Sequence, residues 1–486
     1  MRVPKEGLNI WDGFTHRYPT KGKDKSTGDI AAGSYLHYKA DIDVMKEIGV
    51  DAYRFSVAWS RIIPRGKASC GVNEEGIGIK PFVTLFHCDL PQTLQDEYEG
   101  FLDHQIIEDF KSYTEICFQR FGDRVKNWIT INQPYTIPTR GYATGTDAPG
   151  RCSAWLNKNC YAGDSATEPY IVAHHVLLAH ATVVNLYRQK YQLIQAGEIG
   201  ITMITRWFLP YNNSDENLKA VERAKEFMDP LTKGHYPLIM KQILKKRLPR
   251  FTAIEALLVK GSYDFIGVNY YMTQFAKAVP PANPNRLSVM TDSQVDLSYV
   301  NEDGPISRCP FGDVYYRPRG ILDVLEYFKT NYGNPKVYIT ENGKYAFEVL
   351  IAIGWPMKSR TIMRELDLYA VIFNSNCIVF LLTINRNGCQ VKGYFVWSLG
   401  DNYEFCDGYT VRCGLMYIDF ANITHDRDLK SSGKWYQEFL KPKQNVITKV
   451  QDYHSQRFLY DSYTHPQSRD TLAHTARHKC QCPVAT

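Results

Sequence analysis

Short runs of apolar and β-branched residues alternate along the chain with longer stretches in which apolar residues recur at helical spacing. The helical pattern is clear at 38–48, 106–121 and 169–191, and the first of these stretches ends at Gly49. Such alternation predicts a parallel sheet built from β-α-β units. We expect strands at 51–56, 82–86, 128–131, 201–204, 265–269, 338–340 and 393–397. These seven strands are one short of the eight that close an α/β barrel.

Each predicted strand ends on a side chain that can take part in chemistry. Taken singly, a strand-end arginine usually forms a surface ion pair, and a lone histidine or tryptophan usually packs in a core. In an α/β barrel, however, the carboxyl ends of the strands all lie on one face, and that face carries the active site. The side chains together therefore predict one catalytic rim, formed by Arg54, His87, Asn132 with Gln133, Arg206, Asn269 with Tyr271, Glu341 and Trp397.

Two segments interrupt the alternation. Between 60 and 81, where a crossover helix is expected, six prolines and glycines exclude a stable helix. Between 344 and 387 the amphipathic pattern is lost. The last residues, 465–486, are polar and basic, and we expect them to be disordered. We therefore predict a single barrel domain over 1–464 that lacks part of one crossover helix.

The composition is typical of one large globular enzyme domain. The chain has 486 residues, 44% of them hydrophobic and 22% charged, with a formal net charge of +6. Its lysines and arginines are dispersed, so no nucleic-acid partner is expected. The N-terminus lacks an apolar signal core, and the most apolar window, 377–384, is far shorter than the ~20 residues that cross a bilayer. Cys152 and Cys160 close a short loop. Their spacing is compatible with a disulfide and equally with two free thiols.

The predicted rim combines an acid with an amide. A glutamate flanked by an arginine and a tyrosine is suited to act as a nucleophile, because the cation stabilises the carboxylate and the phenol orients it. Glu341, Arg54 and Tyr271 can supply this arrangement. A retaining glycosidase also uses a second carboxyl group ~5 Å from the first. Gln133 can form hydrogen bonds but cannot transfer a proton, so this site needs a leaving group that departs unprotonated.

Motifs along most of the chain resemble those of the β-glucosidases of glycoside hydrolase family 1, in the family order. They are YRFS at 53–56, TLFH at 84–87, ITENG at 339–343 and WSLGDNYEF at 397–405. TINQ at 130–133, with glutamine where most members have glutamate, is similar to the plant myrosinases of that family, as are GYTVRCGL at 408–415 and DRDLKSSGKW at 426–435. The resemblance implies a TIM (β/α)8 barrel that hydrolyses the thioglucosidic bond of glucosinolates by a retaining mechanism, releasing glucose and an unstable thiohydroximate aglycone.

The resemblance also implies roles for individual residues. Glu341 is the expected nucleophile, held by Arg54 and Tyr271, while Gln133 helps to position the attacking water. The residues expected to bind or flank the glucose are His87, Asn132, Trp397, Glu404, Phe405 and Tyr409.

Further implied partners lie outside the sugar site. Ascorbate is expected to supply the missing base, next to Arg206 and Gln133. Arg140 and Gln274 match positions that hold the substrate sulfate. His16 and Asp29 match a zinc site shared across the two-fold axis of a homodimer. The family resemblance also implies a vacuolar location.

Three features depart from the family pattern. Nothing before Trp11 matches the first barrel strand, so we expect an incomplete barrel that lacks this strand and one sugar contact. Cys88 stands where a tryptophan is expected after His87. Residues from 344 to 390 are unrelated to the family. Two alternatives therefore stay open: an O-β-glucosidase or transglucosidase that tolerates Gln133, and an inactive protein that still binds sugar.

Overall fold

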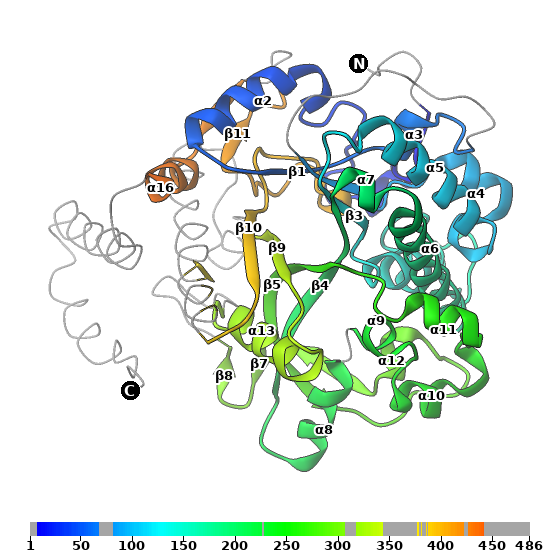
Figure 1. Cartoon of the computed structure of the whole chain (residues 1–486). Helices are drawn as coiled ribbons and strands as arrows, with labels where there is room; N and C mark the ends of the chain where they lie inside the picture. The colour runs from blue at the N-terminus through cyan, green and yellow to red at the C-terminus, as the bar shows by residue number, and fades with distance from the viewer. Residues whose placement is uncertain are drawn as a thin grey trace, which may run out of the picture.

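The computed structural model describes residues 7–67, 81–225, 228–306, 317–343, 377–378, 381, 385, 387–421 and 426–441. Its central sheet has seven parallel strands in the order β1-β2-β3-β4-β5-β9-β10, which curve into a nearly closed barrel (Figure 1). The strands are β1 Tyr53–Ser56, β2 Pro81–Phe86, β3 Asn127–Asn132, β4 Glu198–Pro210, β5 Phe265–Ala278, β9 Val337–Asn342 and β10 Val391–Val396.

All seven predicted strands are confirmed, with β4 and β5 longer than expected. These two continue as a parallel pair as far as Pro210 and Ala276, where β6 (Val295–Ser298) joins β5 in antiparallel orientation. Within the described ranges no eighth parallel strand pairs with β1 or β10. The shorter strands are β7 Val300–Asn301, β8 Gly304–Pro305, β11 Met416–Ile418 and β12 Arg427–Leu429.

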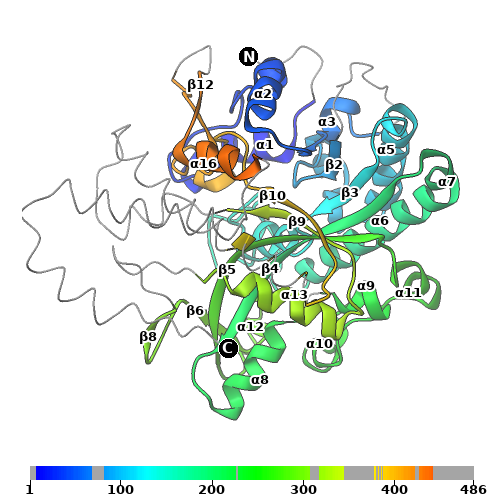
Figure 2. The same ribbon diagram turned by 60° about the vertical axis from the view of Figure 1, so that its left-hand side comes forward.

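Helices pack around the outside of the sheet, as Figure 2 shows. The three predicted helices correspond to α2 (Ser34–Ile48), α5 (Ile106–Phe121) and α6 (Glu168–Lys190). α2 ends at Gly49, whose φ of +83° glycine adopts without strain. The others are α1 Ile10–Arg17, α3 Trp59–Ile62, α4 Gln92–Tyr98, α7 Gln192–Gln195, α8 Asp215–Ala224, α9 Asp229–Lys233, α10 Leu238–Leu244, α11 Ala253–Val259, α12 Val289–Asp292, α13 Gly320–Asn331, α16 Ser431–Leu440 and the π-helix η4 Ile137–Thr144.

α6 is long and apolar enough to cross a membrane by length and composition alone. However, 72% of its most apolar window is buried inside the protein, where the helix packs against α5 and α11. This burial is that of a core helix.

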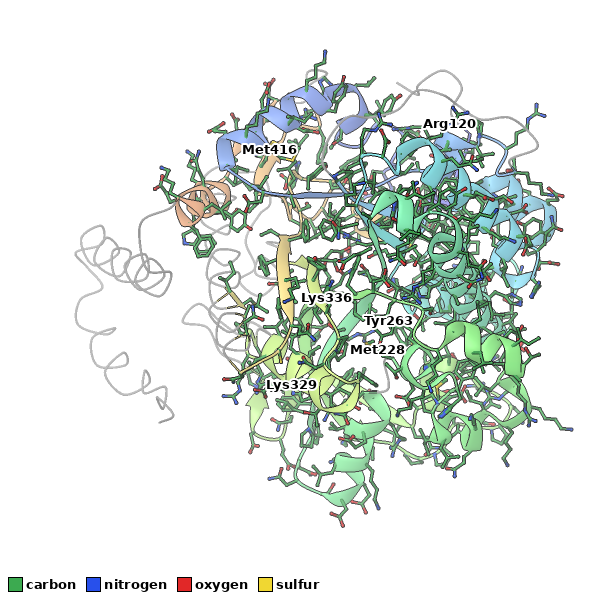
Figure 3. The ribbon with its side chains drawn as sticks, in the orientation of Figure 1. Arg120, Met228, Tyr263, Lys329, Lys336 and Met416 are labelled. Carbon is green, nitrogen blue, oxygen red and sulfur yellow. A yellow bond between two sulfur atoms is a disulfide. The ribbon has the colours of Figure 1, made fainter. Side chains whose placement is uncertain are left out.

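Aromatic rings fill the barrel around the amino ends of β2 and β9. Phe82 of β2 lies edge-on to Tyr338 of β9 and to Phe395 of β10, with ring centroids 4.8 and 5.0 Å apart. Near the same end Lys336, labelled in Figure 3, forms an ion pair with Glu198 at the start of β4. These contacts join four strands below the rim. The carboxyl ends are thereby left for polar side chains.

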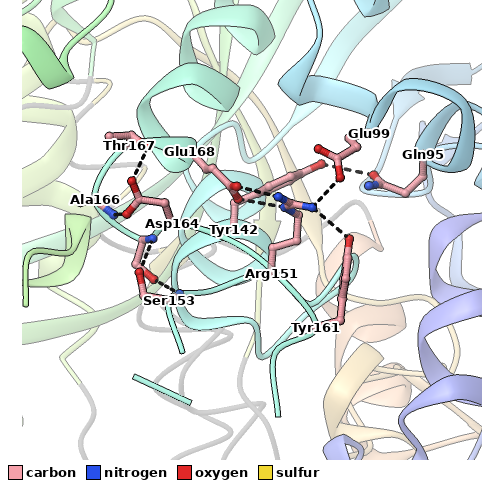
Figure 4. Close-up of polar contacts among 11 residues, drawn as sticks. Gln95, Glu99, Tyr142, Arg151, Ser153, Tyr161, Asp164, Ala166, Thr167 and Glu168 are labelled. Atoms are coloured by element: carbon pink, nitrogen blue, oxygen red, sulfur yellow. Dashed lines mark hydrogen bonds and ion pairs between the residues drawn. The ribbon is translucent and has the colours of Figure 1, made fainter. Parts of the chain in front are cut away.

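The loop after η4 is fixed to the helices beside it (Figure 4). The guanidinium of Arg151 is buried and donates two hydrogen bonds, of 2.9 and 2.6 Å, to Glu168 at the start of α6. A third, of 2.8 Å, goes to Glu99 after α4. In the next residues Cys152 and Cys160 form a disulfide, which decides between the two alternatives that their spacing left open. Arg151 therefore holds the first part of the loop to α6 and to the end of α4, and the disulfide closes the part that follows on itself.

Several predictions fall wholly or mostly outside the described residues. These are the tail at 465–486, most of the interrupted segment at 60–81, and nearly all of the segment at 344–387. The domain boundary at 464 stays a prediction for the same reason.

Candidate active site

Glu341 is the centre of a polar cluster on the carboxyl ends of the strands. It is the penultimate residue of β9, and its side chain is only 3% exposed. Arg54 of β1 donates from Nη1 to Glu341 Oε1 at 2.8 Å. Tyr271 of β5 donates from its hydroxyl to Oε2 at 2.6 Å. The structure thus brings together the three residues that the sequence predicted as a nucleophile and its two supports.

Hydrogen bonds through the side-chain amide of Asn132 connect Arg54 to His87. Asn132 Oδ1 accepts hydrogen bonds from Arg54 Nη2 at 2.9 Å and from Asn269 Nδ2 at 3.1 Å. Its Nδ2 atom must then face the ring Nε2 of His87, 3.1 Å away, as a donor. Asn269 accepts a bond from Thr340 in turn. Asn269 was predicted on the rim without a role, at the end of a strand expected over 265–269; β5 instead continues to Ala278.

His87 is neutral in this setting. Burial lowers the pKa of His87 to about 4, with the Glu341 charge opposing and the Arg54 charge assisting the decrease. A neutral imidazole can accept the Asn132 hydrogen bond at Nε2, which leaves the proton on Nδ1. The ring presents a hydrogen-bonding edge rather than a charge to whatever binds beside it.

Gln133 lies directly against the carboxylate. Its Nε2 atom donates to Glu341 Oε2 at 3.3 Å, and its Oε1 atom accepts from the Thr136 hydroxyl at 2.9 Å. The contact with Glu341 fixes which way the amide points, since an amide oxygen in place of Nε2 could not donate to the carboxylate, whereas the Thr136 hydroxyl can donate or accept. Gln133 also has a φ of +53°, a left-handed conformation in which its side chain turns towards β9. Thr136, which sequence analysis missed, is therefore a positioning residue.

Aromatic rings pack along the side of the cluster that carries His87. The His87 ring lies nearly parallel to Trp397, with centroids 5.8 Å apart, and to Phe405, at 6.4 Å. Behind Phe405, Trp11 of α1 packs at 4.6 Å and donates its indole N–H to the Cys88 carbonyl. The predicted sugar-flanking Phe405 is therefore beside the cluster. Trp11 had no assigned role.

Glu404 is a second buried carboxyl group near Glu341. Burial raises the pKa of Glu404 to about 8, and the Glu341 charge raises it further, while hydrogen bonds from Trp397 and Cys413 oppose the increase. Glu404 is therefore mostly protonated at neutral pH. The site then has one buried carboxylate, on Glu341, and one buried carboxylic acid.

Arg206 and Gln274 were assigned to different ligands, yet they contact each other. Arg206 on β4 donates from Nη1 to Gln274 Oε1 on β5 at 3.4 Å. The Arg206 guanidinium lies 5.5 Å from the centre of the Tyr135 ring, two residues after Gln133. A cation thus sits close to the amide side of the cluster.

Arg140 is engaged in an ion pair that the sequence did not predict. It lies on η4 and contacts both oxygens of Asp147 at 2.8 Å, through Nε and Nη2. Two of its three guanidinium nitrogens are thereby occupied, so an incoming sulfate would share or displace Asp147.

The remaining predicted residues lie near the N-terminal segment. His16 Nε2 is 3.1 Å from Asp29 Oδ2, and both side chains are well exposed. The part of the chain that the structure describes contains no group of three or more metal-ligating side chains. Tyr409 packs on Phe420 and donates its hydroxyl to the Thr27 carbonyl.

The chemistry open to this cluster is limited by its donors. A buried carboxylate with two fixed hydrogen-bond donors can attack an electrophilic carbon. The third group that contacts it is the Gln133 amide, which cannot protonate a leaving group. The roles of the individual residues in binding a substrate stay predictions.

Comparison with known proteins agrees with this geometry. A family model described as Glycosyl hydrolase family 1 matches residues 5–445. Myrosinase 2 of Arabidopsis thaliana is 56% identical over 466 residues, covering 92% of this chain and 83% of the relative. Myrosinase of Brassica napus is 52% identical over 464 residues, covering 89% and 83%. The structure of a rice β-glucosidase mutant in a covalent complex with glucose superposes with a TM-score of 0.84 at 40% identity, covering 90% of this chain and 94% of that one.

Proposed function

The chain belongs to glycosyl hydrolase family 1, and on that basis we propose that it hydrolyses the thioglucosidic bond of glucosinolates with retention of configuration. The substrate class is supported by relatives named as myrosinases at 52–56% identity over about nine-tenths of the chain. The observation that carries the proposal is the 3.3 Å contact between the Gln133 amide and the Glu341 carboxylate.

The proposed reaction follows from what these residues can and cannot do. Glu341 attacks the anomeric carbon and forms a glycosyl ester, while the C–S bond breaks and its electron pair leaves with the aglycone sulfur. No proton is needed for this step, because a thiohydroximate departs readily as the anion, whereas an alkoxide does not. Arg54 and Tyr271 hold the carboxylate in one orientation throughout. Water then cleaves the ester and releases glucose.

Gln133 leaves the second step without a base from the chain. When bound, ascorbate supplies that base. Arg206 and Gln133 would hold it, and their donor groups suit an anion: the Arg206 guanidinium lies 5.5 Å from the ring of Tyr135, two residues after Gln133, whose amide N–H group contacts Glu341. The chain's own contribution is to place Gln133 where it can donate a hydrogen bond to the attacking water.

We also propose that His16 and Asp29 hold a zinc ion at a dimer axis. An imidazole and a carboxylate are zinc ligands, and the Nδ1 atom of His16 is already fixed 2.7 Å from the Asp12 carbonyl. One copy supplies two donors, so a tetrahedral site needs the same pair from a second copy. Molecular mass in solution with zinc, with a chelator, and in a His16→Ala variant tests this. A mass that never changes would contradict it.

Glucose release from allyl glucosinolate by the purified chain tests the main proposal. We expect release that ascorbate stimulates and that a Glu341→Ala variant lacks. Glucose itself is measured, because the aglycone is unstable and its signal alone is not sufficient. Absence of release from protein with a cooperative unfolding transition would reject the proposal and favour an inactive sugar-binding protein.

An O-β-glucosidase is the second candidate, favoured by the 40% identity and 0.84 TM-score to a rice β-glucosidase. It predicts turnover of alkyl O-glucosides, whose alkoxide leaves poorly, without any effect of ascorbate. Comparing an alkyl O-glucoside with 4-nitrophenyl glucoside separates the two. The thioglucosidase proposal predicts turnover of the nitrophenyl substrate only.

A further inference from the structure

The loop that carries Trp397 and Glu404 contains a buried carboxylate, Asp401. Its side chain is 0% exposed. Lys430 donates from Nζ to Asp401 Oδ1 at 2.6 Å, and Arg412 donates from Nη1 to Oδ2 at 3.3 Å. Two cations from different segments of the chain therefore share one buried carboxylate, which keeps it charged.

The same carboxylate also fixes the backbone of a neighbouring segment. Asp401 Oδ1 accepts a hydrogen bond from the Gly414 N–H group at 3.1 Å. Lys430 donates to the Arg412 carbonyl at 3.1 Å as well as to the carboxylate. The backbones meet so closely that a Cβ atom on Gly414 would lie 2.2 Å from the Asp401 amide nitrogen. Arg412 and Gly414 are therefore both held to Asp401, one on each side of Cys413.

Cys413 connects this network to Glu404. Cys413 is buried, and its thiol forms a hydrogen bond with the Glu404 carboxyl group. Trp397 forms a second hydrogen bond with the same group. The Glu404 Oε1 atom has no hydrogen-bond partner among the residues that the structure describes. The orientation of the Glu404 side chain therefore depends on where Cys413 and Trp397 are held.

Backbone hydrogen bonds join the two segments at further points. The Ser398 amide donates to the Cys413 carbonyl at 3.2 Å, and the Leu415 amide donates to the Ser398 carbonyl at 2.8 Å. The Asp401 amide donates to the Met416 carbonyl at 2.9 Å. The loop and the segment at 412–416 thus form one unit, and the Asp401 carboxylate is its charged anchor.

We propose that Asp401 is a positioning residue for the sugar site, acting through Cys413 on Glu404. The inference rests on the proposed glycosidase function, in which Glu404 is expected to bind the sugar. Asp401 acts without touching the ligand, because it is buried and its carboxylate already accepts hydrogen bonds from three donors. A Glu404 side chain that is already in place does not have to be ordered when the sugar binds, which favours binding.

Replacing Asp401 by asparagine tests the anchor. Asp401→Asn keeps the shape of the side chain but removes its charge, so the contacts with both cations weaken. We expect the affinity for 1-deoxynojirimycin, a glucose analogue with nitrogen in its ring, to fall about tenfold, because a small displacement of a binding group has a large effect. Calorimetry measures the dissociation constant and the number of sites separately. A variant that is only less stable loses sites, whereas a displaced Glu404 changes the dissociation constant.

Asp292→Asn is the matched control. Asp292 ends α12, is buried, and accepts hydrogen bonds of 2.7 and 2.8 Å from Arg247. Its replacement should lower stability and leave the dissociation constant unchanged.

A pair of uncharged variants tests the same path if Asp401→Asn does not fold. Cys413→Ser keeps a donor for Glu404, whereas Cys413→Ala removes it. We therefore expect weaker binding in Cys413→Ala than in Cys413→Ser. Equal affinities in these two variants would contradict a role for the thiol.

A double-mutant cycle decides whether Asp401 acts through Glu404. The Asp401→Asn and Cys413→Ala substitutions are repeated in a Glu404→Ala protein, which has no carboxyl group left to position. There each should change the affinity by less than about twofold, since the effects of coupled residues do not add. Equal losses in both backgrounds would overturn the inference, as would wild-type protein that does not bind the analogue. Coupled losses in a protein that hydrolyses no glucoside would support the inference while the catalytic proposal fails.

Discussion

Replacing Gln133 by glutamate tests whether this side chain decides the leaving group. A carboxylate in place of the amide would lie about 3.3 Å from Glu341 Oε2. Two negative charges at that distance repel by about 5 kcal/mol at an effective dielectric constant of about 20, and by about 3 kcal/mol after relaxing to ~5 Å. Arg54 and Tyr271 hold Glu341 as the anion, so the introduced group takes up the proton. The repulsion of about 3 kcal/mol raises its pKa by roughly two units.

The assay compares kcat/KM for methyl β-glucoside and for a glucosinolate, from acid to alkaline pH, with and without ascorbate. We expect hydrolysis of the methyl glucoside to increase by about 10² to 10⁴, the usual contribution of general acid–base catalysis. The rate should fall above the raised pKa, and ascorbate stimulation should disappear. Gln133→Asn, which offers no carboxyl group, is the control. Hydrolysis of the methyl glucoside that stays at the wild-type rate in a folded Gln133→Glu protein would refute the reasoning.

Three other predictions each concern a single buried or partly buried side chain. Arg151→Ala leaves Glu168 without its cation and should lower the free energy of unfolding in urea by about 3 kcal/mol; a change below about 1 kcal/mol would contradict this. Tyr271→Phe removes the 2.6 Å bond to Glu341 and should lower kcat about 10- to 100-fold with little change in unfolding. The pKa of Glu404 is raised to about 8 from its usual 4.5, so the folded state holds the proton more tightly and loses stability as pH rises through that window. Glu404→Gln should remove this slope from urea unfolding at pH 5, 7 and 9, and an unchanged slope would contradict the assignment.

The two end strands of the seven-strand sheet affect the stability of the protein. β1 and β10 end the seven-strand sheet, and within the described residues each pairs with one parallel neighbour only. Aromatic contacts such as Phe82 with Phe395 still join β2 to β10 across the barrel. The Arg54–Glu341 ion pair likewise joins β1 to β9. Contacts through the interior therefore join strands on either side of the boundary between β1 and β10.

The sequence by itself determined the strands and the rim. Strand positions follow from local periodicity, which needs only neighbouring residues to be read. The placement of Glu341, Arg54 and Tyr271 on one face was predicted from the carboxyl ends of the expected strands, although β5 continues past Tyr271 to Ala278. The family motifs then assigned them roles. The strands needed few corrections because β-branched runs bounded by glycine and proline leave little choice of register.

Only the tertiary structure decided how the side chains meet. Thr136 fixes the Gln133 amide, Asp147 occupies Arg140, and the Cys152 thiol has a partner within bonding distance. Each of these depends on a distance set by the packing of loops, and no periodicity encodes it. The raised pKa of Glu404 depends further on burial. Burial is a property of all the atoms around a group, most of which come from residues far away in the sequence, so it appears only when the chain is folded.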